Sequence, residues 1–244
     1  NQCGIQKRHG CSVRSLIETI FALPFLGKNF FRGIVTNEQS VVGKDAAYDL
    51  LKASTYNWRR FLLILAVRIY GIFSQLTDEQ REDVLIIDDS TYDRSRSKKV
   101  ELLSRVFDHS TGRYLRGFRM LTVSWSDGVS SLPLDFALLS SAKAKHRYQE
   151  ETKSVDKRCC AHRRRQEATM KATEHLGPMV ERILKAGIKA RYVLMDRWFT
   201  MPSNIAVLRE HLDVIGMVKK SSKIHYEHNG HKRDLTTIYQ KLRK

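Results

Sequence analysis

Two short apolar segments of the chain each end in aspartate. Residues 84–87 run into Asp88 and Asp89, and residues 192–195 run into Asp196. Short continuous apolar runs are typical of strands buried on both faces, and sites in open α/β sheets are built at the carboxyl ends of strands. Two carboxylates brought together there would repel each other unless a divalent cation lay between them. Mg²⁺ is bound in this way, by one or two carboxylates together with waters and substrate phosphates.

Such a pair of aspartates indicates phosphoryl-transfer chemistry. Two metal ions held by carboxylates can stabilise the attacking and leaving oxygens of a phosphate ester. Taken alone, Asp89 or Asp196 is more often a turn former or a helix cap. The occurrence of both aspartates after similar strands favours a functional role, but spacing alone does not establish that the two strand ends meet.

The net charge favours a polyanionic partner. The 43 Lys and Arg residues exceed the 26 Asp and Glu residues, which gives a formal net charge of +17. Nucleic acid is the first partner that such a surplus suggests, and an anionic membrane surface is the second. Basic residues are clustered, and those that we predict to contact nucleic acid are Arg94, Arg96, Lys98, Lys219 and Lys220.

Composition excludes several classes of protein. Apolar residues make up 42% of the chain, which is too many for a disordered protein. The longest apolar run, residues 61–67, is far shorter than the roughly 20 residues that cross a bilayer, so we expect no membrane partner. Four cysteines make a poor disulfide set, and we expect a reducing, cytoplasmic setting: Cys3, Cys11, Cys159 and Cys160.

The elements that must position the aspartates follow from hydrophobic periodicity. Residues 1–77 are predicted to be helical, with a long helix capped by Thr55 or Asn57. Beyond this segment we predict strands over residues 84–87, 119–125, 132–139, 191–195 and 214–219, and helices over 167–186 and 202–211. A mixed sheet covered by helices accommodates this order. We therefore predict an α/β fold preceded by a helical N-terminal region.

The segments that end in aspartate resemble the catalytic motifs of DDE transposases from bacterial insertion sequences, most closely the insertion-sequence-four family. The first motif is Ile86-Ile87-Asp88-Asp89-Ser90-Thr91, and the second is Val193 to Phe199, which contains Asp196, Arg197 and Trp198. The resemblance covers about residues 80–220. It implies an RNase H-like core over residues 78–220, a possible DNA-binding region over 1–77, and the start of a β-rich insertion over 221–244.

The resemblance also implies roles for individual residues. Asp89 and Asp196 would hold Mg²⁺ or Mn²⁺, with Asp88 a less favoured substitute because it points to the opposite face of the strand. Arg197 and Trp198 would line the DNA-facing edge, where an aromatic ring can stack on an extruded base. The implied reaction is cleavage of the ends of an insertion sequence followed by strand transfer. The implied partners are double-stranded DNA and a second copy of the chain, in the bacterial cytoplasm at the nucleoid.

One feature departs from this family. In the insertion-sequence-four family, the third carboxylate is a Glu on a helix after the insertion, within a Tyr…Arg…Glu…Lys pattern. In this chain, neither Glu210 nor Glu227 matches that pattern. We therefore expect a chain that stops before the final Glu. Two alternatives stay open: a catalytically inactive DNA-binding fragment, and a metal-dependent nuclease without strand transfer. A Cys159–His162 nucleophile is the least favoured reading, because no acid or oxyanion donor accompanies it.

Overall fold

A computed structural model describes residues 2–76, 81–152, 154–218, 220–221 and 223–242. The described chain divides into two compact units that interleave along the sequence. The first comprises residues 1–65, 92–118 and 137–170, and the second comprises residues 66–91, 119–136 and 171–244. The boundaries predicted after residues 77 and 220 remain predictions.

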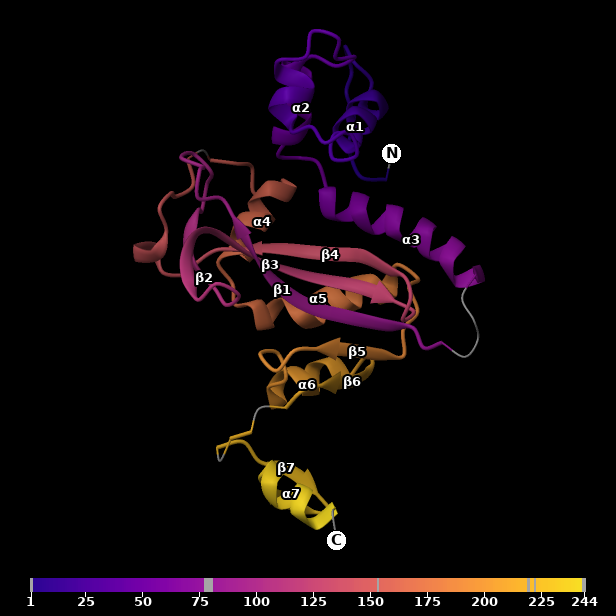
Figure 1. Ribbon diagram of the computed structural model, residues 1–244, viewed down its shortest axis with the longest axis vertical. Coiled ribbons are helices and arrows are strands. Elements are labelled where there is room, and N and C mark those ends of the chain that lie inside the picture. The colour runs from indigo at the N-terminus through magenta and orange to yellow at the C-terminus, as the bar shows by residue number, and fades with distance from the viewer. Residues whose placement is uncertain (1, 77–80, 153, 219, 222, 243–244) are drawn as a thin grey trace. The chain divides into compact units, whose positions relative to one another are not determined.

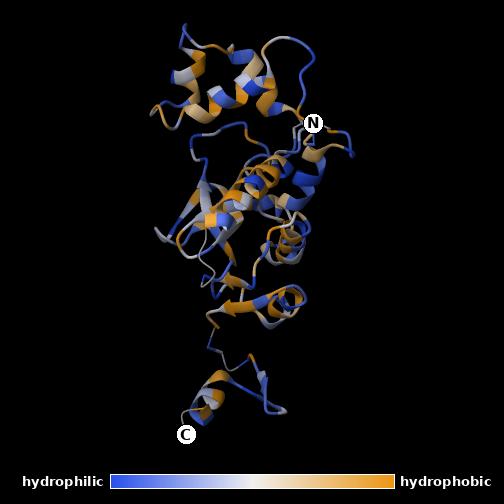
Figure 2. Ribbon diagram, turned by 90° about the vertical axis from the view of Figure 1, so that its right-hand side faces the viewer, coloured by the Kyte–Doolittle hydropathy of each residue, from blue (hydrophilic) through white to orange (hydrophobic). Residues whose placement is uncertain are grey.

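The N-terminal region is helical, as predicted. It contains α1 (Val13–Ala22), the π-helical turn η1 (Phe31–Val35), α2 (Lys44–Lys52) and α3 (Trp58–Leu76). The side chain of Asn57 caps α3, because its Oδ1 accepts a hydrogen bond of 3.0 Å from the backbone N–H of Arg60. Hydrophobic and hydrophilic residues alternate along these ribbons (Figure 2). Their apolar faces meet in a core that includes Leu16, Ile34 and Leu50.

A mixed sheet follows the helical region. Its strands are β1 (Val84–Asp93), β2 (Ser104–Asp108), β3 (Arg113–Ser126), β4 (Ser131–Leu139), β5 (Tyr192–Met195) and β6 (Asp213–Gly216). The strand order is β2-β3-β1-β5-β6, with β4 also paired to β3 (Figure 1). Strand β5 runs parallel to both β1 and β6, whereas β2 and β3 are antiparallel. The predicted α/β class, a mixed sheet flanked by helices, is confirmed.

The helices of the second half are α4 (Cys160–Ala168), α5 (Ala172–Lys185) and α6 (Pro202–Arg209), with the short η2 turn (Ala144–His146) before them. The helix predicted over 167–186 is confirmed as α5 from Ala172 to Lys185, but its predicted start is wrong, because residues 167–168 form the end of α4 and a short non-helical segment separates the two helices. Glu174 accepts a hydrogen bond of 3.1 Å from the backbone N–H of Lys171, which caps α5 at that break. Arg182 of α5 forms an ion pair of 2.8 Å with the buried Asp135 of β4, which ties this helix to the sheet.

The strand that carries Asp88 and Asp89 is covered fully on one face only. Leu85 and Ile87 of β1 are buried, whereas Val84 and Ile86 are half-buried. The prediction of a strand buried on both faces is therefore wrong for the described part of the chain. Met179 and Ile183 of α5 are buried as fully as Leu85 and Ile87 of β1.

A hairpin and a helix complete the described chain: β7 (Tyr226–His228), β8 (His231–Arg233) and α7 (Leu235–Leu242). The turn predicted at Asn229 and Gly230 is confirmed, since both residues have positive φ angles, of 51° and 74°. No helix within the described residues is both long and apolar enough to span a membrane.

Candidate active site

Asp88 and Asp196 lie on the same face of two neighbouring parallel strands. The pairing of β1 with β5 is Leu85 with Val193, Ile86 with Leu194 and Ile87 with Met195. Continued by one residue, this register sets Asp88 beside Asp196. Adjacent strands are about 4.8 Å apart, so the two side chains lie within reach of one cation.

The two carboxylates are held locally in the same way. Oδ1 of Asp88 accepts a hydrogen bond of 2.8 Å from the backbone N–H of Asp89, and Oδ1 of Asp196 accepts one of 2.6 Å from the backbone N–H of Arg197. Neither carboxylate forms an ion pair with any of the residues that the structure describes. Both side chains are exposed, so one oxygen of each remains available to a ligand.

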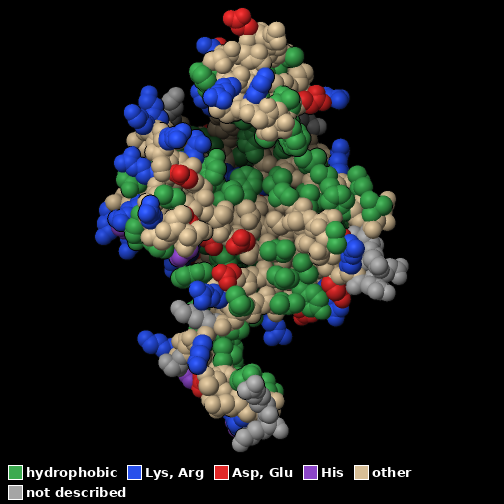
Figure 3. Space-filling view, viewed as in Figure 1, with side chains coloured by type: hydrophobic (Ala, Val, Ile, Leu, Met, Phe, Trp, Pro, Cys, Tyr) green, Lys and Arg blue, Asp and Glu red, His purple; other side chains and the backbone are tan. Residues whose placement is uncertain are grey.

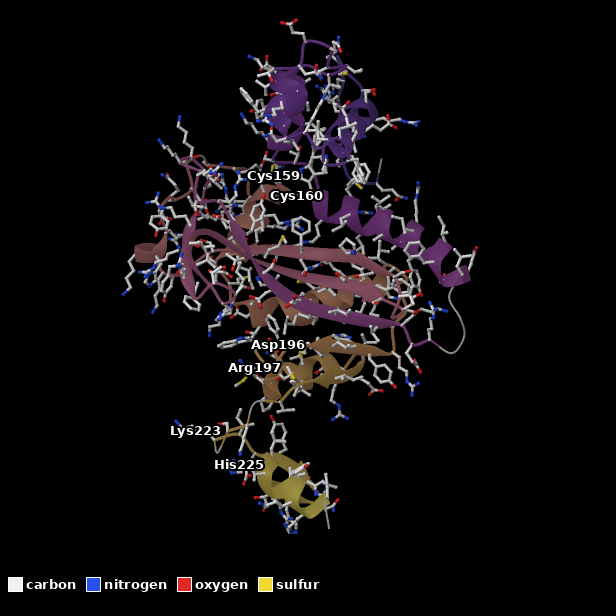
Figure 4. The ribbon with its side chains drawn as sticks, in the orientation of Figure 1. Cys159, Cys160, Asp196, Arg197, Lys223 and His225 are labelled. Carbon is white, nitrogen blue, oxygen red and sulfur yellow. The ribbon has the colours of Figure 1, made fainter. Side chains whose placement is uncertain are left out.

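A pocket with a volume of about 470 Å³ lies beside the two aspartates. Asp88 and Asp196 both line it, and its apolar wall includes Ile86, Leu194 and Ile215 from three adjacent strands. Acidic side chains gather in Figure 3 around the position at which Figure 4 labels Asp196 and Arg197. This face of the sheet therefore combines an acidic end with an open apolar wall.

Asp89 has a different environment from Asp88. Strand alternation turns its side chain to the other face of β1, where it forms an ion pair with Arg119 of β3. The Asp89 side chain is only 15% exposed. Asp89 therefore has a cationic partner, whereas Asp88 has none among the residues that the structure describes.

The loop that follows Asp196 is fixed by buried groups. Thr200 is buried, and its hydroxyl lies 2.6 Å from the carbonyl oxygen of Met217 and 3.1 Å from that of Arg197. Asn204 donates a hydrogen bond of 2.9 Å to the carbonyl oxygen of Phe199, which is itself buried. These contacts join the β5–α6 loop to the chain after β6 and hold the backbone around Asp196 in place.

The aromatic pair of the second motif divides between two roles. Phe199 is 3% exposed and belongs to the core, whereas Trp198 is 54% exposed. Arg197 beside it is exposed as well. Trp198 and Arg197 are thus accessible to solvent, and their placement at a DNA-facing edge stays a prediction.

The predicted basic contacts fall in both units. Arg96 and Lys98 are exposed and Arg94 is half-buried, with its guanidinium carbon 5.6 Å from the ring centre of Tyr92. These three residues belong to the first unit, and Lys220, which is exposed, belongs to the second. Lys219 lies outside the described residues.

Hard oxygen ligands suit Mg²⁺ or Mn²⁺, so the pair formed by Asp88 and Asp196 fits either ion. Among the described residues, no group of three His, Cys, Asp or Glu side chains is placed to hold a metal. Glu210 follows the end of α6, and Glu227 lies in β7; both are exposed. The site therefore offers two carboxylates, with the remaining coordination positions left to water and phosphate oxygens.

One surface was not anticipated from the sequence. Exposed aromatic and arginine side chains alternate along β2 and the first part of β3. The signal was present as Arg105-Val106-Phe107 and Tyr114-Leu115-Arg116, in which basic and aromatic residues are two positions apart and so share one face of a strand.

Comparison with known proteins gives a family match over most of the chain. The family described as DDE superfamily endonuclease matches residues 36–241. Among solved structures, the chain is similar to the Drosophila P element transposase strand transfer complex, with 13% sequence identity and a TM-score of 0.24. That similarity covers 66% of this chain and 34% of the other, so the chain spans about a third of that protein's length. A search of curated proteins gave no match.

Proposed function

The chain belongs to the DDE superfamily endonuclease family, and we propose that it is the catalytic part of an insertion-sequence transposase that performs metal-dependent DNA cleavage and strand transfer. The observation that carries this proposal is a pair of carboxylates, Asp88 and Asp196, at matching positions of two parallel strands. Neither has a cationic partner within the described part of the chain. The resemblance of the two motifs to the insertion-sequence-four family supports the same function.

In this proposal, Asp88 and Asp196 hold Mg²⁺ or Mn²⁺ through the carboxylate oxygens that face the pocket. When bound, the metal supplies an activated water and stabilises charge on the phosphate oxygens. The backbone N–H groups of Asp89 and Arg197 fix the orientation of the two carboxylates. The buried Thr200 and Phe199 hold the loop that carries Asp196.

The assignment of Asp89 as the first ligand, which the motif implies, is the competing version of the same site. It would require Asp89 to release Arg119 and to turn toward the face that Asp196 occupies. The strand register supports Asp88, because alternation sets Asp88 and Asp196 on one face.

The partner in this proposal is double-stranded DNA, held through phosphate contacts that carry no sequence information. Arg197, Trp198 and Lys220 lie on or after the loops of the second unit and are all exposed. A reaction at both ends of an insertion sequence calls for two copies of the chain, so we propose a homodimer on DNA at the bacterial nucleoid.

A second candidate function is DNA binding without catalysis. It is favoured by one observation: the described residues bring two carboxylates together and not three. In that case, the same acidic pair would bind metal weakly and no cleavage would follow.

Calorimetric titration of MnCl₂ into the full chain tests the site. We expect binding by the wild type, loss of binding in Asp88→Asn and in Asp196→Asn, and retention in the matched control Asp89→Asn. If Asp88→Asn retained Mn²⁺ binding and Asp89→Asn lost it, Asp89 and not Asp88 would be the first metal ligand. Unchanged binding in all three variants would exclude a metal site at these strand ends.

Incubation with supercoiled plasmid and Mg²⁺ or Mn²⁺ then separates the candidate functions. Nicked plasmid alone indicates a nuclease, and DNA strands joined to the plasmid indicate strand transfer. Plasmid that is bound but intact indicates the binding-only function.

A further inference from the structure

Arginines and aromatic rings share one exposed face of the antiparallel pair formed by β2 and β3. The register sets Arg105 opposite Arg116 and Phe107 opposite Tyr114. Because residues two apart on a strand share a face, these four side chains form one surface. Tyr148 joins them, since the backbone N–H of Tyr148 donates a hydrogen bond of 2.7 Å to the carbonyl oxygen of Leu103.

We call this surface the aromatic platform and define it as Arg105, Phe107, Tyr114, Arg116 and Tyr148. All five residues belong to the first compact unit, so their mutual arrangement is fixed within it. The three rings are 37%, 58% and 44% exposed in the order Phe107, Tyr114 and Tyr148. Lys and Arg side chains gather over the side of the molecule on which β2 is drawn (Figure 3).

The arginines of the platform lie on its rings. The guanidinium carbon of Arg105 is 3.8 Å from the ring centre of Tyr114, and that of Arg116 is 4.4 Å from the ring centre of Tyr148. The rings of Phe107 and Tyr114 are 5.1 Å apart and tilted by 65°. A guanidinium that contacts a ring in this way can still donate hydrogen bonds from its N–H groups to a phosphate.

The platform carries positive charge that no carboxylate among the described residues neutralises through an ion pair. Neither Arg105 nor Arg116 forms an ion pair with any described carboxylate. Like charges directly opposite each other on a sheet destabilise it, so an anion that bridges them is favoured electrostatically. The surface thus combines two cations with three partly exposed rings, on two of which the guanidinium groups already stack.

We propose that the aromatic platform binds single-stranded DNA. Unpaired bases expose faces that stack on aromatic rings and on guanidinium planes, and their phosphates lie within reach of the same arginines. Duplex DNA buries its base faces in its own stack, so only the arginines could contact it. This inference rests on the proposed function, which makes DNA the partner. The platform is a second DNA-binding surface, separate from Asp88 and Asp196, and it prefers unpaired strands.

Fluorescence anisotropy measures the affinity of the chain for labelled single-stranded oligodeoxythymidylate. The comparison is the same labelled strand annealed to oligodeoxyadenylate as a duplex. We expect the full chain to bind the single strand more tightly than the duplex at the same salt concentration. Tyr114→Leu or Phe107→Leu keeps an apolar side chain but removes the ring, and each should weaken single-strand binding roughly tenfold with little change on the duplex. The matched control is Phe25→Leu, which removes a ring that is 77% exposed outside the platform and should change neither affinity.

The charge contribution is measured by salt dependence. The double variant Arg105→Gln/Arg116→Gln should reduce the slope of log affinity against log salt by roughly 1.4 on the single strand. Lys28→Gln/Arg32→Gln, which removes two exposed cations elsewhere in the same unit, should leave this slope unchanged.

Two results would overturn the proposal: single-strand affinity of Tyr114→Leu equal to that of the wild type, or equal losses on single-strand and duplex DNA. The second result would reduce the platform to a basic patch. Circular dichroism melting of each variant establishes that it is folded. Single-strand binding should persist in Asp88→Asn. The anisotropy experiment therefore tests the platform independently of the proposed metal site.

Discussion

Asp88 and Asp196 stand at matching positions, each one residue past the last paired residues of two parallel strands, and each accepts a hydrogen bond from the next backbone N–H. Neither has a cationic partner among the described residues, although the chain carries a net charge of +17. Arginine does neutralise the neighbouring Asp89, through Arg119. The site is thus acidic within a basic protein.

The first prediction concerns repulsion between the two carboxylates. In metal-free buffer, Asp88→Asn should stabilise the protein by up to about 1 kcal/mol, because it removes one of two like charges on adjacent strands. Thermal unfolding should also show that Mn²⁺ raises the melting temperature of the wild type and not that of the variant. Asp89→Asn, which breaks an ion pair instead, should lower stability; a stabilised Asp89→Asn would contradict this picture.

The second prediction concerns Gly216 at the end of β6. A Cβ atom at this position would lie 2.4 Å from Cγ2 of Thr200 and 3.0 Å from the carbonyl oxygen of Met195. Gly216→Ala should therefore cost about 1–3 kcal/mol in the free energy of unfolding, measured in urea. Gly43→Ala is the matched control, since a Cβ atom there meets nothing within 4 Å, and it should lose little or no stability.

The third prediction concerns the hydroxyl of Thr200. Thr200→Val keeps the shape of the side chain but removes the hydroxyl, whose single hydrogen is nearest to the carbonyl oxygen of Met217, at an oxygen–oxygen distance of 2.6 Å. We expect a loss of about 1–2 kcal/mol in urea unfolding, together with weaker Mn²⁺ binding because the Asp196 loop is loosened. Thr200→Ser retains the hydroxyl and should preserve most of the Mn²⁺ affinity; a Thr200→Val variant that binds Mn²⁺ as tightly as the wild type would show that the hydroxyl does not hold the Asp196 loop.

The fourth prediction concerns the ion pair between α3 and α4. The two terminal nitrogens of Arg59, Nη1 and Nη2, donate hydrogen bonds of 3.2 and 2.8 Å to the carboxylate oxygens of Glu167. The Arg59 side chain is only 10% exposed. Glu167→Gln leaves that charge without a full counter-charge and should cost about 3 kcal/mol. Glu18→Gln breaks the exposed pair with Arg14 and should change the stability much less, because solvent screens this pair.

The fifth prediction concerns acid stability. Burial alone would raise the pKa of the Glu101 carboxyl, but hydrogen bonds from Thr152 and the ion pair with Arg165 outweigh burial and hold this pKa below its ordinary value. The folded state therefore binds the proton less tightly than the unfolded state. The resulting stabilisation is present above the ordinary carboxyl pKa and is lost as pH falls through the lowered one.

Urea unfolding across that pH range checks the sign. Glu101→Gln should be less stable than the wild type at neutral pH, and the two stabilities should converge between about pH 5 and pH 3. A difference between the two proteins that stays constant over this range would show that the carboxyl charge is not responsible.

The amino-acid sequence determined the elements that local patterns specify. Alternating apolar residues marked the strands around Leu121 and Leu134, helical spacing marked α1 and α3, and Asn229-Gly230 marked a hairpin turn. The sequence did not reveal the break after Ala168, because helical periodicity continues across it and the capping contact of Glu174 depends on the folded loop. It also left β2 unpredicted, since that strand is short and mostly polar.

For the candidate site, the sequence determined that two short apolar strands run into aspartate and that the chain is strongly basic. It could not choose between Asp88 and Asp89, because adjacent residues of a strand differ only in the face to which they point. The parallel register of β1 with β5 decided this point, since it sets Asp88 beside Asp196 and leaves Asp89 with Arg119. Pairing between strands more than a hundred residues apart is a property of tertiary structure, because no local pattern fixes which strands become neighbours or in what register.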